Sequence, residues 1–158
     1  MDRDFIVNYL NSAAQVMQEN KENLIKMDSI VGDADLGLTM SDGFKAAYDA
    51  ANESDEHDLG KLLYQAGKAM SIKVPSTMGT LMASGFMQAG KTFRGKETFE
   101  AKDLIDLFES YMDGVQHRGK AKVGEKTFLD GIYPAVQAMK ELSGAESDDL
   151  KRLAEAGY

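Results

Sequence analysis

Residues 3–19, RDFIVNYLNSAAQVMQE, carry the first periodic apolar pattern of this chain. Its apolar side chains recur at steps of three and four residues: Ile6, Tyr9, Leu10, Ala13, Val16 and Met17. Such steps place side chains on one face of an α-helix, whereas a half-buried strand alternates at every second residue. Residues 3–19 are therefore predicted to form an amphipathic helix, and the same period continues to residue 27.

Helical spacing returns along the rest of the chain. Further helices are predicted around residues 40–48, 59–70, from the turn at 74–80 to 89, and over 101–117, 126–142 and 148–156. No sustained alternating run rich in Val, Ile, Thr and aromatic residues is present, so the β signal is weak. We expect an all-α antiparallel bundle of six or seven helices.

Composition limits the classes of function. The 18 Lys and Arg against 26 Asp and Glu give a formal net charge of −8, which repels polyanions, so neither nucleic acid nor a membrane is expected as partner. Cysteine is absent, which excludes thiolate catalysis and cysteine-ligated metal. The charged residues 1–4 are followed by no long apolar run, so we read no signal peptide and expect a cytoplasmic protein.

Three aspartates interrupt the helical pattern in residues 28–37, DSIVGDADLG. Asp33 and Asp35 flank a turn residue and Asp28 ends the preceding helical pattern, so their carboxylates can converge. They would repel one another without a cation, and Mg²⁺ suits a few carboxylates together with phosphate oxygens. The alternative is that they are helix caps and turn residues without a ligand. An EF-hand is excluded, because its twelfth position would be Phe44 instead of Glu.

Two further segments could contact phosphate. Residues 76–80, STMGT, stand at an expected helix start, where free N–H groups favour anions. Taken alone, these residues are better explained by simple capping by Ser76 or Thr77. Residues 119–127 nearly spell a Walker A motif, but Glu125 interrupts it and a helix is predicted where a strand would precede. This basic loop either lies near phosphates or is simply solvated.

Other polar residues are expected on the surface. His57 and His117 share no recognisable motif with Ser or Asp. The carboxylates of Asp103, Asp106 and Glu109 are spaced as the polar face of a helix and need no function.

The order of these segments resembles the nucleotide-binding L subunit of dihydroxyacetone kinases. Residues 28–37 are similar to its signature D-x-x-[IV]-G-D-G-D-H-G, and residues 74–81 to its turn V-G-G-A-S-G-P-L. Residues 124–130 with 134–135 are similar to its G-D-K-T-M-L-D…P-A. The resemblance covers nearly the whole chain and implies an eight-helix, barrel-like bundle with a nucleotide pocket at one end.

The resemblance also implies a ligand set. Two Mg²⁺ ions would lie between the phosphates of ADP or ATP and the metal ligands Asp28, Asp33 and Asp35. The residues that it places around the nucleotide are Leu36, Gly37, Leu38, Thr39, Ser76, Thr77, Met78, Gly79, Gly119 and Phe128. No catalytic base is expected on this chain. A partner K subunit would hold dihydroxyacetone, and in the phosphotransferase-dependent type a phosphohistidine carrier subunit would rephosphorylate the bound ADP.

Three departures from the family pattern each remove a polar phosphate contact. Leu36 stands for His, Thr39 for Asn and Met78 for Ser. Residues 1–158 are expected to form a single domain that lacks the family's C-terminal segment. The resemblance implies a phosphoryl-donating kinase subunit that is active only with its partner. The alternative is a degenerate nucleotide-sensing or regulatory module without catalysis.

Overall fold

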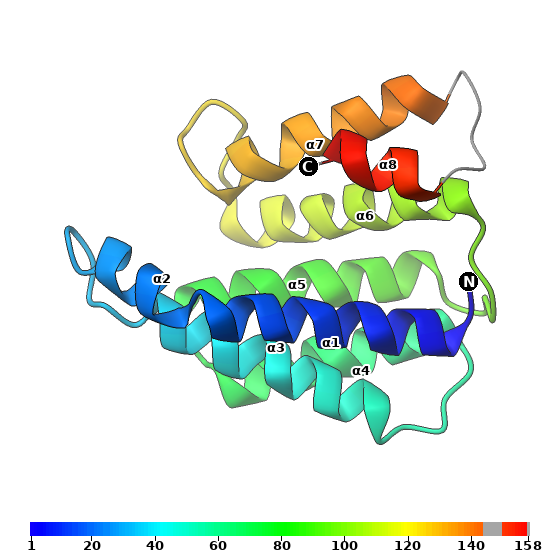
Figure 1. Cartoon of the computed structure of the whole chain (residues 1–158), viewed down its shortest axis with the longest axis horizontal. Coiled ribbons are helices and arrows are strands. Elements are labelled where there is room, and N and C mark those ends of the chain that lie inside the picture. The colour runs from blue at the N-terminus through cyan, green and yellow to red at the C-terminus, as the bar shows by residue number, and fades with distance from the viewer. Residues whose placement is uncertain (144–149, 158) are drawn as a thin grey trace.

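The computed structural model describes residues 1–143 and 150–157. This part of the chain holds eight α-helices and no strand (Figure 1): α1 Arg3–Glu19, α2 Lys21–Asp28, α3 Leu36–Asn52, α4 Leu59–Lys73, α5 Thr77–Thr92, α6 Ala101–Gly119, α7 Phe128–Ser143 and α8 Leu150–Gly157. The prediction of an all-α bundle is confirmed. The predicted start of the last helix, residue 148, lies outside the described residues.

The helix count exceeds the expected six or seven because the apolar period of residues 6–27 belongs to two helices. Asn20 alone separates them. Its side-chain amide donates to the carbonyl of Val16 at 2.9 Å, and its backbone N–H donates to the same oxygen at 3.1 Å. Helix α2 begins at the next residue, Lys21. It contributes no buried side chain and projects from the bundle as an arm (Figure 1).

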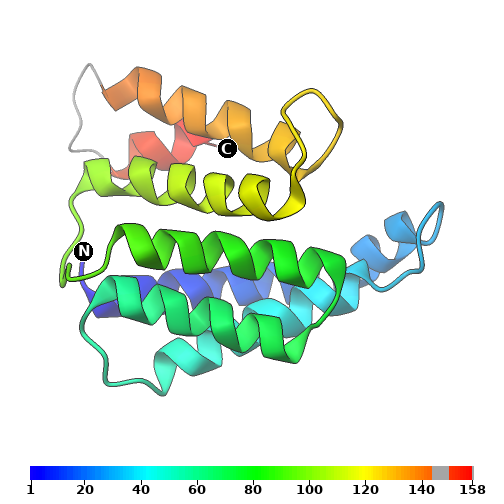
Figure 2. The ribbon, with the colours of Figure 1, turned by 180° about the vertical axis from the view of Figure 1, so that it is seen from behind.

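The helices form a bundle in which α1, α3, α4 and α5 pack side by side. Helix α6 packs on α5, and α7 with α8 lies beyond it (Figure 2). Glycines let α4 and α5 cross closely, because a Cβ on Gly90 would lie only 2.6 Å from the carbonyl oxygen of Gly60. The core is closed by side chains with almost no exposed surface, among them Ile6, Leu10, Leu62, Leu63 and Met82.

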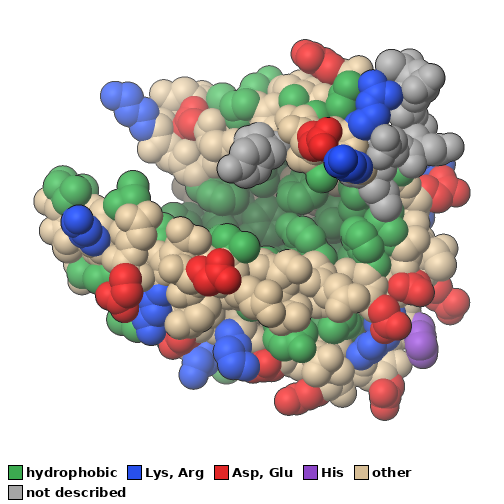
Figure 3. Space-filling model, in the orientation of Figure 1, with side chains coloured by type: hydrophobic (Ala, Val, Ile, Leu, Met, Phe, Trp, Pro, Cys, Tyr) green, Lys and Arg blue, Asp and Glu red, His purple; other side chains and the backbone are tan. Residues whose placement is uncertain are grey.

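The apolar interior is not completely filled. Cavities of about 540 and 200 Å³ lie beside each other, and both are lined by Tyr9, Leu107, Phe108 and Ile132. Figure 3 shows the hydrophobic hollow between the α1 layer and the C-terminal helices. Within the described part of the chain, none of the helices combines the length and hydrophobicity that spanning a bilayer requires.

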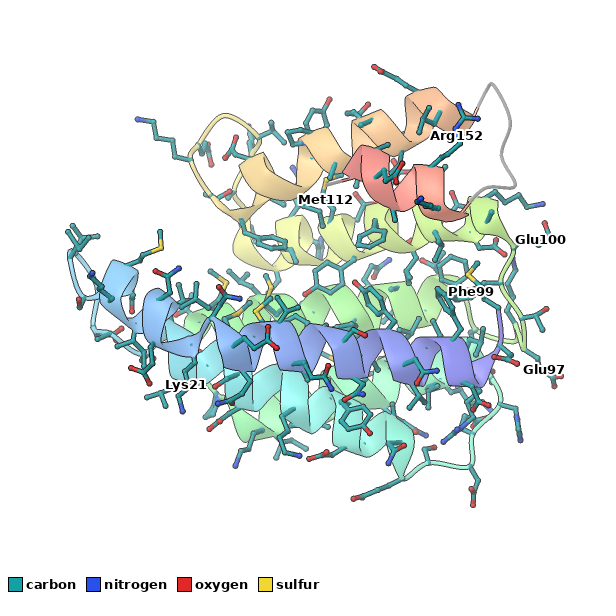
Figure 4. All side chains as sticks on the ribbon, viewed as in Figure 1. Lys21, Glu97, Phe99, Glu100, Met112 and Arg152 are labelled. Carbon is teal, nitrogen blue, oxygen red and sulfur yellow. The ribbon has the colours of Figure 1, made fainter. Side chains whose placement is uncertain are left out.

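One predicted surface carboxylate is instead buried. Asp103, in the first turn of α6, is only 3% exposed. It accepts hydrogen bonds from the Lys96 ammonium at 2.6 Å and from the backbone N–H of Glu100 at 2.9 Å, which closes a capping box. Figure 4 shows Glu97 and Glu100 at the end of the bundle opposite the α2 arm.

Three connections gather at the end of the bundle that carries the α2 arm (Figures 1 and 2). They are residues 29–35 between α2 and α3, residues 74–76 between α4 and α5, and residues 120–127 between α6 and α7. The three segments that the sequence marks as candidates for phosphate contact therefore lie at one end of the fold, although they are distant in the chain.

Candidate metal and nucleotide site

The three aspartates of residues 28–37 converge in the structure. Asp28 is the last residue of α2, Asp33 lies in the connection and Asp35 immediately precedes α3. One carboxylate oxygen from each can be chosen so that all three lie within 4.8 Å of one another. Asp28 is partly buried and the other two are exposed. This geometry offers hard oxygen ligands to a single divalent cation.

Backbone hydrogen bonds hold the connection in this shape. The carbonyl of Asp28 accepts from the N–H of Gly32 at 2.7 Å and from that of Val31 at 3.2 Å, which closes a turn. The side chain of Asp28 accepts from the N–H of Leu36, the first residue of α3, at 3.3 Å. Asp28 therefore ties both ends of the connection together.

A left-handed residue separates the other two aspartates. Ala34 has a φ of +63°, a conformation that L-residues other than glycine rarely adopt. It turns the chain between Asp33 and Asp35 so that both carboxylates reach the same volume as Asp28. The family signature has glycine at this position, so the chain keeps the loop shape while bearing the strain of a Cβ.

The cluster perturbs the titration of its own members. The pKa of Asp35 is raised above its ordinary value. The main cause is partial desolvation, followed by the charge and hydrogen bond of Asp33 and then by the charge of Asp28. Like charges held close together disfavour ionisation, and a bound cation would relieve that repulsion. The donor set fits Mg²⁺, because three carboxylates fill only part of its coordination sphere and leave positions for water and phosphate.

The starts of α3 and α5 meet beside this cluster. The hydroxyls of Thr39 and Ser76 lie 3.1 Å apart within hydrogen-bonding distance, and Ser76 accepts from the N–H of Gly79 at 3.1 Å. A Cβ on Gly37 would collide with the backbone of α2, and one on Gly79 would collide with the carbonyl of Val74. Gly37 thus lets the start of α3 pack against α2, and Gly79 lets the chain turn tightly into α5. Helix N-termini of this kind favour phosphate.

The remaining predicted pocket residues lie in different surroundings. Leu38 and Thr77 are exposed, Leu36 is partly buried, and Met78 packs against the core. The ring of Phe128 lies 6.3 Å from that of Tyr111 and lines the 200 Å³ cavity, so it faces the interior of the bundle. Gly119 is exposed, and a Cβ there would lie 3.0 Å from Leu81 on α5.

Two residues of this region have roles that the sequence analysis did not assign. Gly32 has no room for a side chain, because its Cβ would collide with the carboxylate of Asp28. Asp130 accepts hydrogen bonds from two backbone N–H groups of the α6–α7 connection. The only signal for either in the sequence is its place within a family motif.

Comparison with known proteins identifies the family of this chain. A family model described as the DAK2 domain matches residues 30–157. The ADP-binding subunit DhaL of the PEP-dependent dihydroxyacetone kinase 1 of Listeria innocua is 33% identical over 140 residues, which are 89% of this chain and 70% of that protein.

Two other relatives carry similar names. The ADP-binding subunit DhaL of the PEP-dependent dihydroxyacetone kinase of Escherichia coli is 29% identical over 143 residues, covering 90% of this chain and 68% of the relative. The ADP-binding subunit DhaL of the PTS-dependent dihydroxyacetone kinase of Lactococcus lactis is 29% identical over 153 residues, covering 97% of this chain and 77% of the relative.

Proposed function

The chain belongs to the DAK2 domain family, and we propose that it is the Mg²⁺-nucleotide-binding subunit of a dihydroxyacetone kinase. In this role it donates a phosphoryl group to a substrate that a partner K subunit holds. The relatives named above as ADP-binding subunits support ADP or ATP as the nucleotide. The cytoplasm is the compartment that fits such a subunit.

One observation carries the proposal: the convergence of Asp28, Asp33 and Asp35 on one small volume at the end of the bundle. Mg²⁺ bound there, as two ions in the family pattern, would neutralise charge on the transferring phosphoryl group. The protein has a net charge of −8, so its own field repels a triphosphate, and a bound cation would offset the carboxylate cluster locally.

The chain's own groups would position the nucleotide. The hydrogen-bonded pair Thr39 and Ser76 joins two helix starts whose free N–H groups suit phosphate oxygens. Leu36, Gly37, Leu38, Thr77, Met78, Gly79, Gly119 and Phe128 complete the proposed lining. The acceptor hydroxyl and the base that takes its proton would come from the K subunit, and a phosphohistidine carrier subunit would renew the phosphate in a PEP-dependent system.

Calorimetry tests the nucleotide site directly. ADP is titrated into the wild-type protein with Mg²⁺ and with a chelator, and then into Asp33→Ala. We expect binding that requires Mg²⁺ and is lost in the variant. Asp42→Ala, an exposed carboxylate on α3, is the matched control and should bind as wild type does. Binding that survives both the chelator and Asp33→Ala would overturn the proposal.

The substitutions at three positions favour a second candidate, a nucleotide-binding module without catalysis. Leu36, Thr39 and Met78 stand where the family pattern has polar residues, and the Thr39 hydroxyl is paired with Ser76. Phosphoryl transfer to dihydroxyacetone in the presence of a K subunit separates the two. Metal-dependent ADP binding without any transfer would favour the module.

A further inference from the structure

The connection between α6 and α7 is held by a side chain from the helix that follows it. Asp130, in the first turn of α7, accepts from the backbone N–H of Gly124 at 2.5 Å and from that of Thr127 at 2.8 Å. The N–H of Asp130 donates in turn to the carbonyl of Thr127 at 3.0 Å. One carboxylate thus joins the middle of the connection to its end.

The shape that Asp130 holds is not one that the chain adopts easily. Lys120, Gly124 and Lys126 all have a positive φ, of +62°, +96° and +59°. Left-handed conformations at two lysines persist only where surrounding contacts over-determine them. The contacts that do so include those of Asp130, a hydrogen bond from the N–H of Lys122 to the side chain of Glu125 at 2.9 Å, and one from the N–H of Lys120 to the carbonyl of Gln116 at 2.8 Å.

The position of the connection links it to the candidate nucleotide site. It lies at the same end of the bundle as the aspartate connection (Figures 1 and 2). At its base, Gly119 lies against Leu81, which is two residues beyond Gly79 on α5. Its exposed lysines, Lys120, Lys122 and Lys126, bring positive charge to this end of an acidic protein.

We propose that Asp130 is a positioning residue for the nucleotide, because it holds residues 120–127 in the folded shape that lies beside the phosphates. This inference rests on the proposed function and assigns a role that the metal ligands do not fill. In this role Asp130 would contact neither metal nor phosphate. It acts through the backbone of the connection, so that binding need not first order a flexible segment.

The charge of Asp130 is maintained by the same contacts. Hydrogen bonds from the backbone N–H groups of Thr127 and Gly124 hold the pKa of this carboxyl below its usual range. Their effect is larger than the opposing effect of partial desolvation. It therefore stays ionised at neutral pH, where a carboxylate can accept both hydrogen bonds at full strength.

The test compares ADP affinity, in Mg²⁺, of the wild type, Asp130→Ala, Asp130→Asn and the control Asp106→Ala. Asp106 is an exposed carboxylate on α6, and its removal changes the net charge equally. We expect about tenfold weaker binding for Asp130→Ala, a smaller loss for Asp130→Asn, and no change for the control. Trypsin should cleave after the lysines of the connection faster in Asp130→Ala, and ADP should slow that cleavage in the wild type.

A capping role alone would lower the melting temperature of Asp130→Ala and leave its ADP affinity unchanged, which would overturn the inference. If Asp130→Ala does not fold, Gly124→Ala replaces it: that Cβ meets nothing within 4 Å but strains a φ of +96°. Gly124→Ala should then bind ADP more weakly, and unchanged affinity would equally overturn the inference. Failure of the wild type to bind Mg²⁺-ADP would instead overturn the proposed function.

Discussion

Gly32 packs so closely against Asp28 that a single added methyl group would collide with its carboxylate, which we propose as a metal ligand. The N–H of Gly32 also donates to the carbonyl of Asp28 at 2.7 Å, so the two residues are held against each other. The position of one ligand oxygen thus depends on the absence of a side chain four residues later.

Gly32→Ala should therefore displace Asp28 and weaken Mg²⁺-dependent ADP binding by at least tenfold. Overpacking of this kind also costs about 1–3 kcal/mol of stability. Calorimetric titration measures the first effect and urea unfolding the second. The neighbouring change Ser29→Ala, at an exposed residue, is the control, and equal losses in both variants would contradict the explanation.

Ala34→Gly should stabilise the protein. The left-handed φ of +63° strains alanine by about 1–2 kcal/mol, and the greater freedom of glycine in the unfolded chain offsets part of that gain. A net gain of roughly 0.5–1 kcal/mol is expected in urea unfolding. Ala50→Gly, within α3, should instead lower the free energy of unfolding by about 1 kcal/mol, because Ala50 has an unstrained helical backbone and glycine only adds freedom to the unfolded chain. A loss in both variants would argue against strain at Ala34.

Asp35→Asn should stabilise the metal-free protein while abolishing metal-dependent binding. The pKa of Asp35 is raised in the folded protein, so folding favours the protonated carboxyl. The stability that this side chain contributes is therefore fully present below the pKa it has in the unfolded chain, and it is lost as pH rises through the higher pKa of the folded protein. In a chelator at pH 7, Asp35→Asn should melt above wild type, and the difference should vanish in acid. A lower melting temperature at pH 7 would show that repulsion does not dominate the cluster.

Asp103→Asn should destabilise the fold at the end far from the site. Burial would raise the pKa of Asp103, but hydrogen bonds from the Lys96 ammonium and the Glu100 N–H outweigh it and hold the pKa below its usual range. Because the pKa is lower in the folded protein, the ionised Asp103 stabilises the fold at any pH above its pKa in the unfolded chain. This stability is lost as pH falls through the pKa of Asp103 in the folded protein. Urea unfolding at pH 7 should show a loss of about 1–3 kcal/mol.

The loss in Asp103→Asn should shrink as the pH falls below about 4, because the wild type is then protonated too. ADP binding at pH 7 should be unchanged in this variant. Asp106→Asn, an exposed carboxylate on the same helix, should lose less than about 0.5 kcal/mol at any pH. A pH-independent loss for Asp103→Asn would point to packing instead of charge.

Much of the architecture follows from local sequence. The predicted helix over residues 3–19 begins and ends where α1 does, because apolar spacing and the polar residues at its ends act within a few turns. The family prediction is confirmed by the match of the family model to residues 30–157. The convergence of Asp28, Asp33 and Asp35 is also predictable, because all three lie close together in the chain.

Tertiary structure alone decided other features. The burial of Asp103 depends on Lys96, which lies seven residues away in the segment before α6. The break between α1 and α2, by contrast, rests on the local hydrogen bonds of Asn20 to Val16. The spacing of charges on a helix shows which residues share a face, but not what packs against that face.

The sequence by itself determined the helices, the family and the acidic connection, because each rests on residues close together in the chain. Only the folded chain decided that Phe128 faces the interior cavity, that Thr39 meets Ser76, and that the connection of residues 120–127 lies at the end with the aspartates. These relationships join segments up to about a hundred residues apart, and only the packing of whole helices sets the distances between them.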